Sequence, residues 1–344
     1  MARLTGTNPE QVPTNADLGT MAYQDFKTLN DAYITPRPNL IINGDFQVWQ
    51  KGDNIQTGGT TANSMWRMTR GRIRKPNTVS NGITHTGEDE RGAVFDVTDG
   101  GVYQHFDTYI ENKDNMLNGK RCIFSFEAKS LQSENTDNRF GLYIEQSGTS
   151  GVYLDVGNTT ATIYNDWNKY IYYGTITAVN NEAIHLPRWY VNPTGTSGYG
   201  GRMLQVDKVK LEIIDDDLPN YATPFVSQPY TEELHKCQRY FQRYFPTTQT
   251  WIYNESSTSN HKWYNLVFPQ TMYRPPDLYA THNIIGGTNG TLGTITSITR
   301  QGASVNAMSF RVGFNQSTGT ANAIYHVDYW GTNGGYFDLD AALP

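Results

Sequence analysis

The sequence predicts an all-β protein, and three observations lead to that class. The 344 residues include 23 Tyr and 32 Gly but only 17% charged side chains, a composition typical of short strands and many turns. Apolar and polar residues alternate in short runs, and Gly-rich turns such as GGTTAN, DGG and SGTSG separate these runs. No unit of about 20–50 residues recurs, which argues against a parallel β-helix. Along the chain we expect an N-terminal extended anchor segment, a central jelly-roll β-sandwich, a short linker helix and a C-terminal β-sandwich.

Residues 1–37 differ in character from the rest of the chain. They contain turn-forming residues, one short amphipathic stretch around residues 22–29 and no alternating strand. A piece of this size cannot bury enough apolar surface to fold alone. Two interpretations stay open, a peptide that docks onto a neighbouring protein and a flexible leader, and we favour docking.

Residues 38–230 are expected to form one sandwich of many short strands. The strand candidates are residues 40–49, 93–97, 102–109, 121–129, 140–145, 153–156, 168–177, 183–190 and 204–214. In the fourth candidate Cys122 shares a face with Phe124 and Phe126, so we expect a buried free thiol there. A disulfide to the second cysteine, Cys237, stays open as the alternative.

Residues 231–245 are expected to form a linker helix after a proline-rich connector. Pro219, Pro224 and Pro229 exclude regular structure before it, because each lacks a backbone donor. Thr231 is the expected N-cap, and the acidic residues that follow it suit the first turn of a helix. The apolar residues at helical spacing are Leu234, Cys237, Phe241 and Tyr244.

Residues 246–344 are expected to form a second, C-terminal sandwich. Its strand candidates are residues 251–253, 263–268, 278–282, 294–299, 308–314, 324–329 and 336–339. The stretch MSFRVGF alternates most clearly, with Met308, Phe310 and Val312 on one face and Ser309 and Arg311 on the other.

Charge and hydropathy exclude several kinds of partner. The formal net charge is −6, whereas nucleic acids and anionic membranes require basic surfaces. No apolar run has the length of a membrane span, and no signal peptide opens the chain. With its two cysteines interpreted as free thiols, we expect a chain made in a reducing cytoplasm, with no nucleic-acid partner and no membrane insertion.

Catalysis has no positive support in the sequence, so we expect a protein that is not an enzyme and that carries no catalytic residues. Acidic clusters at residues 88–90 and 215–217, and the pair Asp338 and Asp340, lie in turns or at strand ends. The seven histidines lack metal-binding spacing, and no phosphate-binding or nucleophile motif occurs. A catalytic pair of acidic residues that come from different strands stays open as the alternative.

Aromatic side chains near polar turns are the remaining signal for a binding site. Trp and Tyr rings can stack on the apolar faces of sugars, while neighbouring polar groups fix the hydroxyls. The carbohydrate-binding candidates in the C-terminal region are Trp251, Tyr253, Trp263, Tyr264, His326, Asp328, Trp330 and Tyr336. The alternative for each of them is a place in the core or between subunits.

Several stretches, taken together, resemble the tail-fibre and receptor-binding proteins of bacteriophages and prophages. The most telling is ATPFVSQPYTEELHKCQRYFQRY, which is similar to that family's ATPFE-like end of a sandwich followed by an EEL-x-x-CQRYF helix. The other matching stretches are LIINGDFQVWQKG, GKRCIFSFEAKS, DWNKYIYYGTIT, VDKVKLE and FPQTMYRPP, in that order along residues 38–276. Two places depart from the family's pattern, because Glu127 stands where Trp is frequent and MWRM replaces an ADRW-like string.

The resemblance implies a virion protein of the phage tail, assembled in the cytoplasm of the host bacterium as a homotrimer. Residues 1–37 would attach it to other tail or virion proteins, and its sandwiches would recognise host cell-surface polysaccharide. The central sandwich would be a jelly roll like those of carbohydrate-binding modules, with a structural calcium at Asp45 and Asp207 as a weak candidate and no other cofactor. A glycan-depolymerising tailspike and a purely structural adaptor or decoration protein are the alternatives.

Overall fold

The chain is built of β-strands with one short helix within the part that the computed structural model describes, which confirms the all-β class. The described residues are 35–50, 54–57, 61–63, 66–68, 71–77, 88–97, 104–110, 117–131, 138–146, 152–153, 164–175, 184–193, 202–214, 218, 221–244, 250–253, 261–280, 285–288, 291–314, 324–328 and 337–341. Of the predicted N-terminal segment, residues 1–34 lie outside this part, so its docking role stays a prediction.

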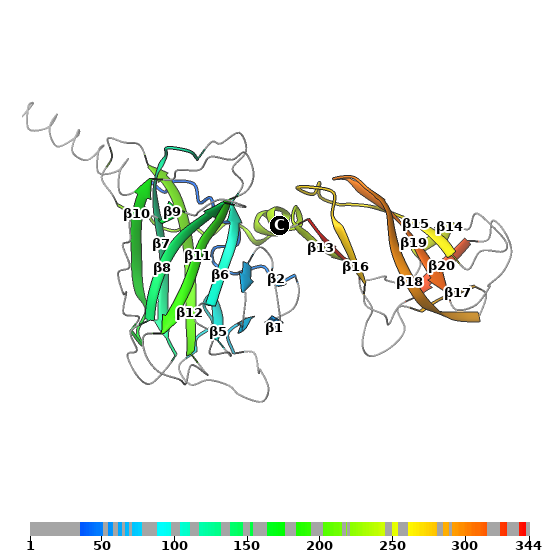
Figure 1. The fold of residues 1–344 in the computed structure, drawn as a ribbon, viewed down its shortest axis with the longest axis horizontal. Helices are drawn as coiled ribbons and strands as arrows, with labels where there is room; N and C mark the ends of the chain where they lie inside the picture. Colours follow the sequence, from blue (N-terminus) through cyan, green and yellow to red (C-terminus); the bar gives the residue numbers. More distant parts are fainter. Residues whose placement is uncertain are drawn as a thin grey trace, which may run out of the picture.

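Two six-stranded antiparallel sheets form the central sandwich (Figure 1). The first sheet contains, in spatial order, β1 (Asn54–Thr57), β4 (Gly71–Arg74), β5 (Ala93–Val97), β12 (Arg202–Ile214), β7 (Arg121–Ser130) and β10 (Asn168–Thr175). The second contains β2 (Thr61–Asn63), β3 (Trp66–Met68), β6 (Gln104–Ile110), β11 (Ile184–Pro193), β8 (Asn138–Gln146) and β9 (Val152–Tyr153). The predicted strand at residues 93–97 matches β5 at both ends, whereas β1 to β4 were missed because they are too short to show alternation.

An aromatic core fills the space between the two sheets. Phe124 and Phe126 point inward from β7 and meet Trp66 of the second sheet in one buried cluster. Each large side chain buried here contributes roughly 1.5–3 kcal/mol by removal from water. Cys122 is buried on the same face of β7 and is a free thiol, as the alternation predicted. Cys237 is also free and buried, so the structure contains no disulfide between the two cysteines.

Residues 40–49, which we expected to form a strand, form turns instead. Asn43 and Phe46 have φ values of 56°, a left-handed conformation that a strand does not allow. The segment nevertheless lies along β12, where Val209 N–H donates to the Gly44 carbonyl at 2.7 Å and the Asn39 side chain bonds the backbone on either side of Lys210. A side chain thus replaces part of the backbone ladder, which alternation in the sequence does not reveal.

A bulge in β12 keeps its apolar residues inward. The register to β7 shifts between Asp207 and Lys210, and Lys208 within the bulge has φ 53°. Val206 and Val209 therefore both reach the core, while Asp207 and Lys210 face the outer side of the sheet. This outer side, turned away from the second sheet, carries the polar groups described below.

The helix α2 (Tyr230–Gln238) is shorter than the predicted linker helix of residues 231–245. Its N-cap position is Pro229, not Thr231, and it ends where Tyr240 N–H donates to the Cys237 carbonyl at 3.0 Å. Residues 241–244, predicted as helix, form the strand β13 (Phe241–Tyr244), because they pair with β21 (Phe337–Asp340) almost 100 residues later. The described residues contain no helix long and apolar enough to cross a membrane.

In the region where we expected a second sandwich, the C-terminal strands form a small sheet and a closed barrel. The three-stranded sheet has the order β13, β21 and β16 (Asp277–Ala280). The barrel has the order β14 (Thr250–Tyr253), β15 (His261–Val267), β19 (Ala307–Phe314), β18 (Thr291–Ala303), β17 (Ile285–Thr288) and β20 (Ile324–Asp328). Closure depends on pairings such as that of β14 with β20, which the sequence does not specify.

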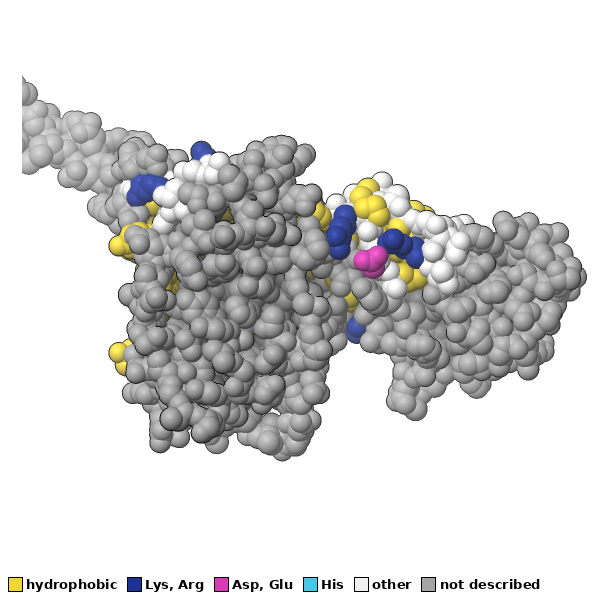
Figure 2. All heavy atoms as spheres, in the orientation of Figure 1, with side chains coloured by type: hydrophobic (Ala, Val, Ile, Leu, Met, Phe, Trp, Pro, Cys, Tyr) yellow, Lys and Arg dark blue, Asp and Glu magenta, His cyan; other side chains and the backbone are white. Residues whose placement is uncertain are grey.

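The helix α2 lies between the sandwich and the C-terminal strands (Figure 1) and contacts both. Cys237 and Tyr240 pack with Val48 of the sandwich in one buried cluster, and Tyr273 stacks on Tyr240 with ring centroids 5.3 Å apart. The Gln50 side chain donates to the Phe241 carbonyl at 2.8 Å. Figure 2 shows Lys and Arg side chains, together with acidic and hydrophobic ones, over the C-terminal strands beside the helix.

Candidate binding site

The carbohydrate-binding candidates of the C-terminal region fall mainly on three neighbouring barrel strands. The backbone register places Trp251 opposite His326 and Tyr253 opposite Trp263. It places Tyr264 opposite Phe310 and Asp328 opposite Ile285. The side chains of these candidates, and the whole of Trp330 and Tyr336, lie outside the described part of the structure. Their ligand role therefore stays a prediction.

The two calcium candidates have different neighbours. Asp45 lies in a turn, not on the predicted strand, and accepts hydrogen bonds from the side chains of Gln47 and of Ser227, the latter at 2.6 Å. Asp207 lies on β12 as expected, and its carboxylate accepts from Arg91 Nε at 3.2 Å. No group of three or more His, Cys, Asp or Glu side chains gathers at either place within the described residues.

A cluster of charged side chains surrounds Trp167 on the outer side of the first sheet, and we call it the outer-face cluster. Its members are Asp89, Arg91, Glu127, Lys129, Trp167, Asp207 and Lys208. The indole N–H of Trp167 donates to Asp89 at 2.6 Å, and the Arg91 guanidinium lies over the ring, 4.4 Å from its centroid. Arg91 also bonds both Glu127 and Asp207, whose Cα atoms are partners across β7 and β12.

The charges of the outer-face cluster are paired with one another. Burial acts to raise the pKa of Asp89, but hydrogen bonds from Trp167 and Lys129 hold it below its usual value. Burial also acts to raise the pKa of Glu127, and hydrogen bonds from Lys208 and Arg91 hold it lower. For Asp207 burial prevails, and its pKa is raised. Because the cluster satisfies its own charges and Arg91 stacks against the indole, we interpret it as a brace across β12, β7 and the start of β10.

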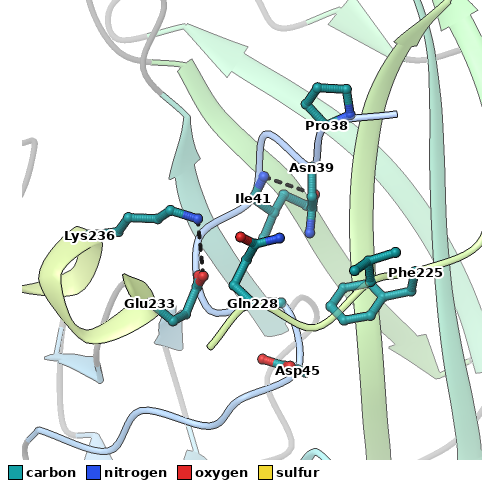
Figure 3. Close-up of a pocket in the computed structure, with 10 residues that line it drawn as sticks. Pro38, Asn39, Ile41, Asp45, Phe225, Gln228, Glu233 and Lys236 are labelled. Atoms are coloured by element: carbon teal, nitrogen blue, oxygen red, sulfur yellow. Dashed lines mark hydrogen bonds and ion pairs between the residues drawn. The ribbon is translucent and has the colours of Figure 1, made fainter. Parts of the chain in front are cut away.

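A pocket of about 180 Å³, which we call the junction pocket, opens where the sandwich meets α2 (Figure 3). Its lining residues are Pro38, Asn39, Ile41, Gly44, Asp45, Phe225, Val226, Gln228, Glu233 and Lys236. They come from three segments: the turns of residues 38–45, the connector of residues 225–228 and the helix. A pocket of this size is smaller than the 300–1,000 Å³ typical of drug-sized ligands and suits one small ring.

Close packing holds the three segments of the junction pocket together. A Cβ atom at Gly44 would lie 2.2 Å from the Val209 carbonyl oxygen, so only glycine lets the turn approach β12 this closely. On the helix side, the buried Glu233 accepts a hydrogen bond from the backbone N–H of Asn43. The other Glu233 oxygen accepts from Lys236 Nζ at 3.2 Å. These contacts join the turn to β12 and to α2 and so hold the pocket walls together.

The polar groups of the junction pocket fall into two sets. Asn39 and Glu233 each use both of their side-chain polar atoms in holding the fold. In contrast, Asp45 uses only its Oδ2 atom, and the exposed Gln228 uses its backbone carbonyl while its side-chain amide bonds no described residue. Lys236 gives one of its three N–H groups to Glu233. An acceptor, an amide and a donor thus line the same pocket as Phe225, with Lys236 on the helix side and Phe225 on the opposite side (Figure 3).

Sequence reasoning found Asp45 as a calcium candidate but missed the pocket to which it belongs. The pocket lies where LIINGDF, around Asp45, meets PFVSQPYTEELHK, which begins at Pro224. Both stretches belong to the set that carries the family resemblance, and this was the signal in the sequence that could have pointed to the pocket. The sequence does not reveal that segments about 190 residues apart meet.

No protein-family model matches the chain, and no curated protein matches it in sequence. Among solved structures, the chain is similar to a family 4 carbohydrate-binding module, with 17% identity over 50% of this chain and 98% of that one and a TM-score of 0.31. It is also similar to a family 61 module in complex with β-1,4-galactotriose, with 15% identity over 52% and 99% of the two chains and a TM-score of 0.30. A tandem of family 22 modules from Paenibacillus barcinonensis Xyn10C covers 89% of this chain and 96% of its own, with 8% identity and a TM-score of 0.33.

Proposed function

We propose that this chain is a phage tail-fibre or receptor-binding protein that recognises host cell-surface glycan and is not an enzyme. The observation that carries glycan binding is the junction pocket. Its lining presents an unused carboxylate oxygen, a side-chain amide that bonds no described residue, an ammonium and an aromatic side chain. Sugars are bound by such combinations, because hydroxyls need donors and acceptors while the ring needs an apolar surface.

The phage part of the proposal is supported by the sequence resemblance over residues 38–276. In this proposal residues 1–37 attach the protein to the tail, the protein is made in the host cytoplasm, and it works in the virion as a homotrimer. One small pocket gives weak affinity, and several copies on one particle add through effective concentration.

The absence of catalysis is part of the proposal, and the outer-face cluster supports it. Glu127 and Asp207 both bond the same Arg91 amino group, so their carboxylates are as close as those of a retaining glycosidase. The guanidinium of Arg91, however, occupies the space between them that a scissile bond needs. This arrangement gives the acid pair a structural role, and we interpret that role as support for a non-enzymatic protein.

Binding of the purified full-length chain to a panel of bacterial strains and their surface polysaccharides tests the proposal. We expect binding that Gln228→Leu weakens, because the amide bonds no described residue and its loss does not disturb the fold. Asp166→Asn, at an exposed aspartate that does not line the pocket, is the matched control and should bind normally. Loss of binding only in Asp328→Asn would move the site to the barrel.

Two outcomes distinguish the alternatives. Release of reducing ends from a bound polysaccharide would show a depolymerising tailspike and would contradict the non-enzymatic proposal. A stable homotrimer that binds no strain and no polysaccharide would favour a structural adaptor or decoration protein.

A further inference from the structure

The polar groups that the junction pocket offers to a ligand differ in charge and in hydrogen-bonding role. Asp45 supplies an acceptor that carries a negative charge, and it is already oriented by Ser227 at 2.6 Å. Gln228 supplies a neutral amide, and Lys236 supplies a donor whose charge is shared with Glu233 at 3.2 Å. The strongest interaction left for a ligand is therefore a donor group directed at Asp45.

Negative charge exceeds positive charge around the junction pocket. The lining contains two carboxylates, those of Asp45 and Glu233, and one ammonium, that of Lys236, which Glu233 already binds. The pKa of the neighbouring Cys237 thiol is raised mainly by burial. The charges of Glu233 and Asp45 raise this pKa further, and the charge of Lys236 lowers it. A ligand carboxylate placed here would lose water and meet Asp45 at short range, which disfavours it by more than about tenfold.

The apolar lining limits the ligand to a small ring. Phe225, Ile41 and Pro38 supply the apolar surface, and the cavity of about 180 Å³ is below the range typical of drug-sized ligands. A single sugar ring fits that space, whereas the rest of a polysaccharide would continue into solvent.

We propose that the junction pocket selects one neutral or amino-substituted hexose ring and rejects acidic sugars, with Asp45 as the residue that sets this preference. The inference rests on the proposed function and specifies its ligand. A hexose donates hydroxyls to Asp45 and accepts from Lys236 and Gln228. When the donor is an ammonium, the bond to Asp45 joins opposite charges and strengthens.

The test measures binding of methyl glycosides to the full-length chain by ligand-observed NMR, with hexose, 2-amino-hexose and hexuronate in both the gluco and galacto series. In the series that binds, we expect the amino sugar to bind about 5–10-fold more tightly than the hexose, and the uronate at least about tenfold more weakly. Asp45→Asn should remove the preference for the amino sugar. Gln228→Leu should weaken all ligands alike, and Asp166→Asn should change nothing.

The outcomes separate this inference from the proposed function. A uronate that binds as well as the hexose, or an amino-sugar preference that survives in Asp45→Asn, would overturn the inference. Host cells bound by a chain that binds none of the six glycosides would also overturn it while leaving receptor binding intact. A chain that binds neither cells nor sugars would refute the proposed function itself. Thermal unfolding of each variant, with midpoints close to the parent, confirms that the folds are comparable.

Discussion

Replacing Glu212 with glutamine should destabilise the sandwich strongly. The Glu212 side chain is 0% exposed and that of Lys210 is 2% exposed, and they form an ion pair of 2.9 Å on the outer side of β12. Both side chains also bind Thr223 of the connector. Lys210 Nζ donates to the Thr223 hydroxyl at 2.5 Å, and the backbone N–H of Thr223 donates to the Glu212 carboxylate at 2.8 Å. The pair therefore joins the connector, and through it α2, to the sheet.

The size of the effect follows from the charge left behind. Glutamine keeps an acceptor for Thr223 but leaves the Lys210 ammonium buried without a counter-charge, which costs about 3–5 kcal/mol. For a sandwich of this size the unfolding midpoint should decrease by about 6–20 °C. Burial already lowers the pKa of Lys210, and Glu212 opposes that shift. In the variant the unfolded chain binds the proton more tightly than the folded one, so stability should increase as pH rises towards 10.

The assay is thermal and urea unfolding followed by intrinsic fluorescence, with hydrogen exchange of residues 221–228 to locate the effect. Asp277→Asn is the control, because it breaks an ion pair to Arg300 whose side chains are 55% and 44% exposed, and it should cost at most about 1 kcal/mol. Lys210→Met combined with Glu212→Leu should recover most of the lost stability. If Glu212→Gln is no more harmful than Asp277→Asn, the reasoning about the buried pair is wrong.

Three further predictions concern single residues of the sandwich and α2. Tyr172→Phe should raise the unfolding midpoint by an amount equivalent to about 1 kcal/mol, because the buried hydroxyl bonds no partner in the described structure. Burial raises the Tyr172 pKa to about 12, so above about pH 10 the unfolded chain releases the phenol proton more readily than the folded one; the parent should lose stability between about pH 10 and pH 12, and the variant's stability curve should be flatter there. Gly44→Ala should destabilise the chain by about 2–4 kcal/mol in urea unfolding through a clash with β12, whereas Gly119→Ala, with φ 73° and open space, should cost only about 1 kcal/mol of backbone strain. Cys122, whose pKa burial raises to about 12, and the buried Cys237 should react with a thiol reagent at pH 8 only after unfolding, and fast reaction of either thiol in the folded chain would contradict their burial.

Local pattern predicted the β-strands best where core residues alternate with polar ones. In β7 the alternation from Phe124 to Lys129 marks the inward residues, and the predicted range of 121–129 differs from the observed strand only by Ser130. Helical spacing from Leu234 to Tyr244 was a weaker guide. Phe241 and Tyr244 continue that spacing, but the pairing of β13 with β21 determines their structure.

The sequence by itself determined the all-β class, the buried thiol at Cys122 and the short helix after Pro229. Each depends on residues within about ten positions of one another, where alternation, turn residues and helix spacing act directly. Only the tertiary structure decided that the turn around Asp45 meets the connector and α2, and that Arg91 separates Glu127 from Asp207. These contacts join segments from 36 to about 190 residues apart, and they exist because burial and charge pairing in the folded chain bring those segments together.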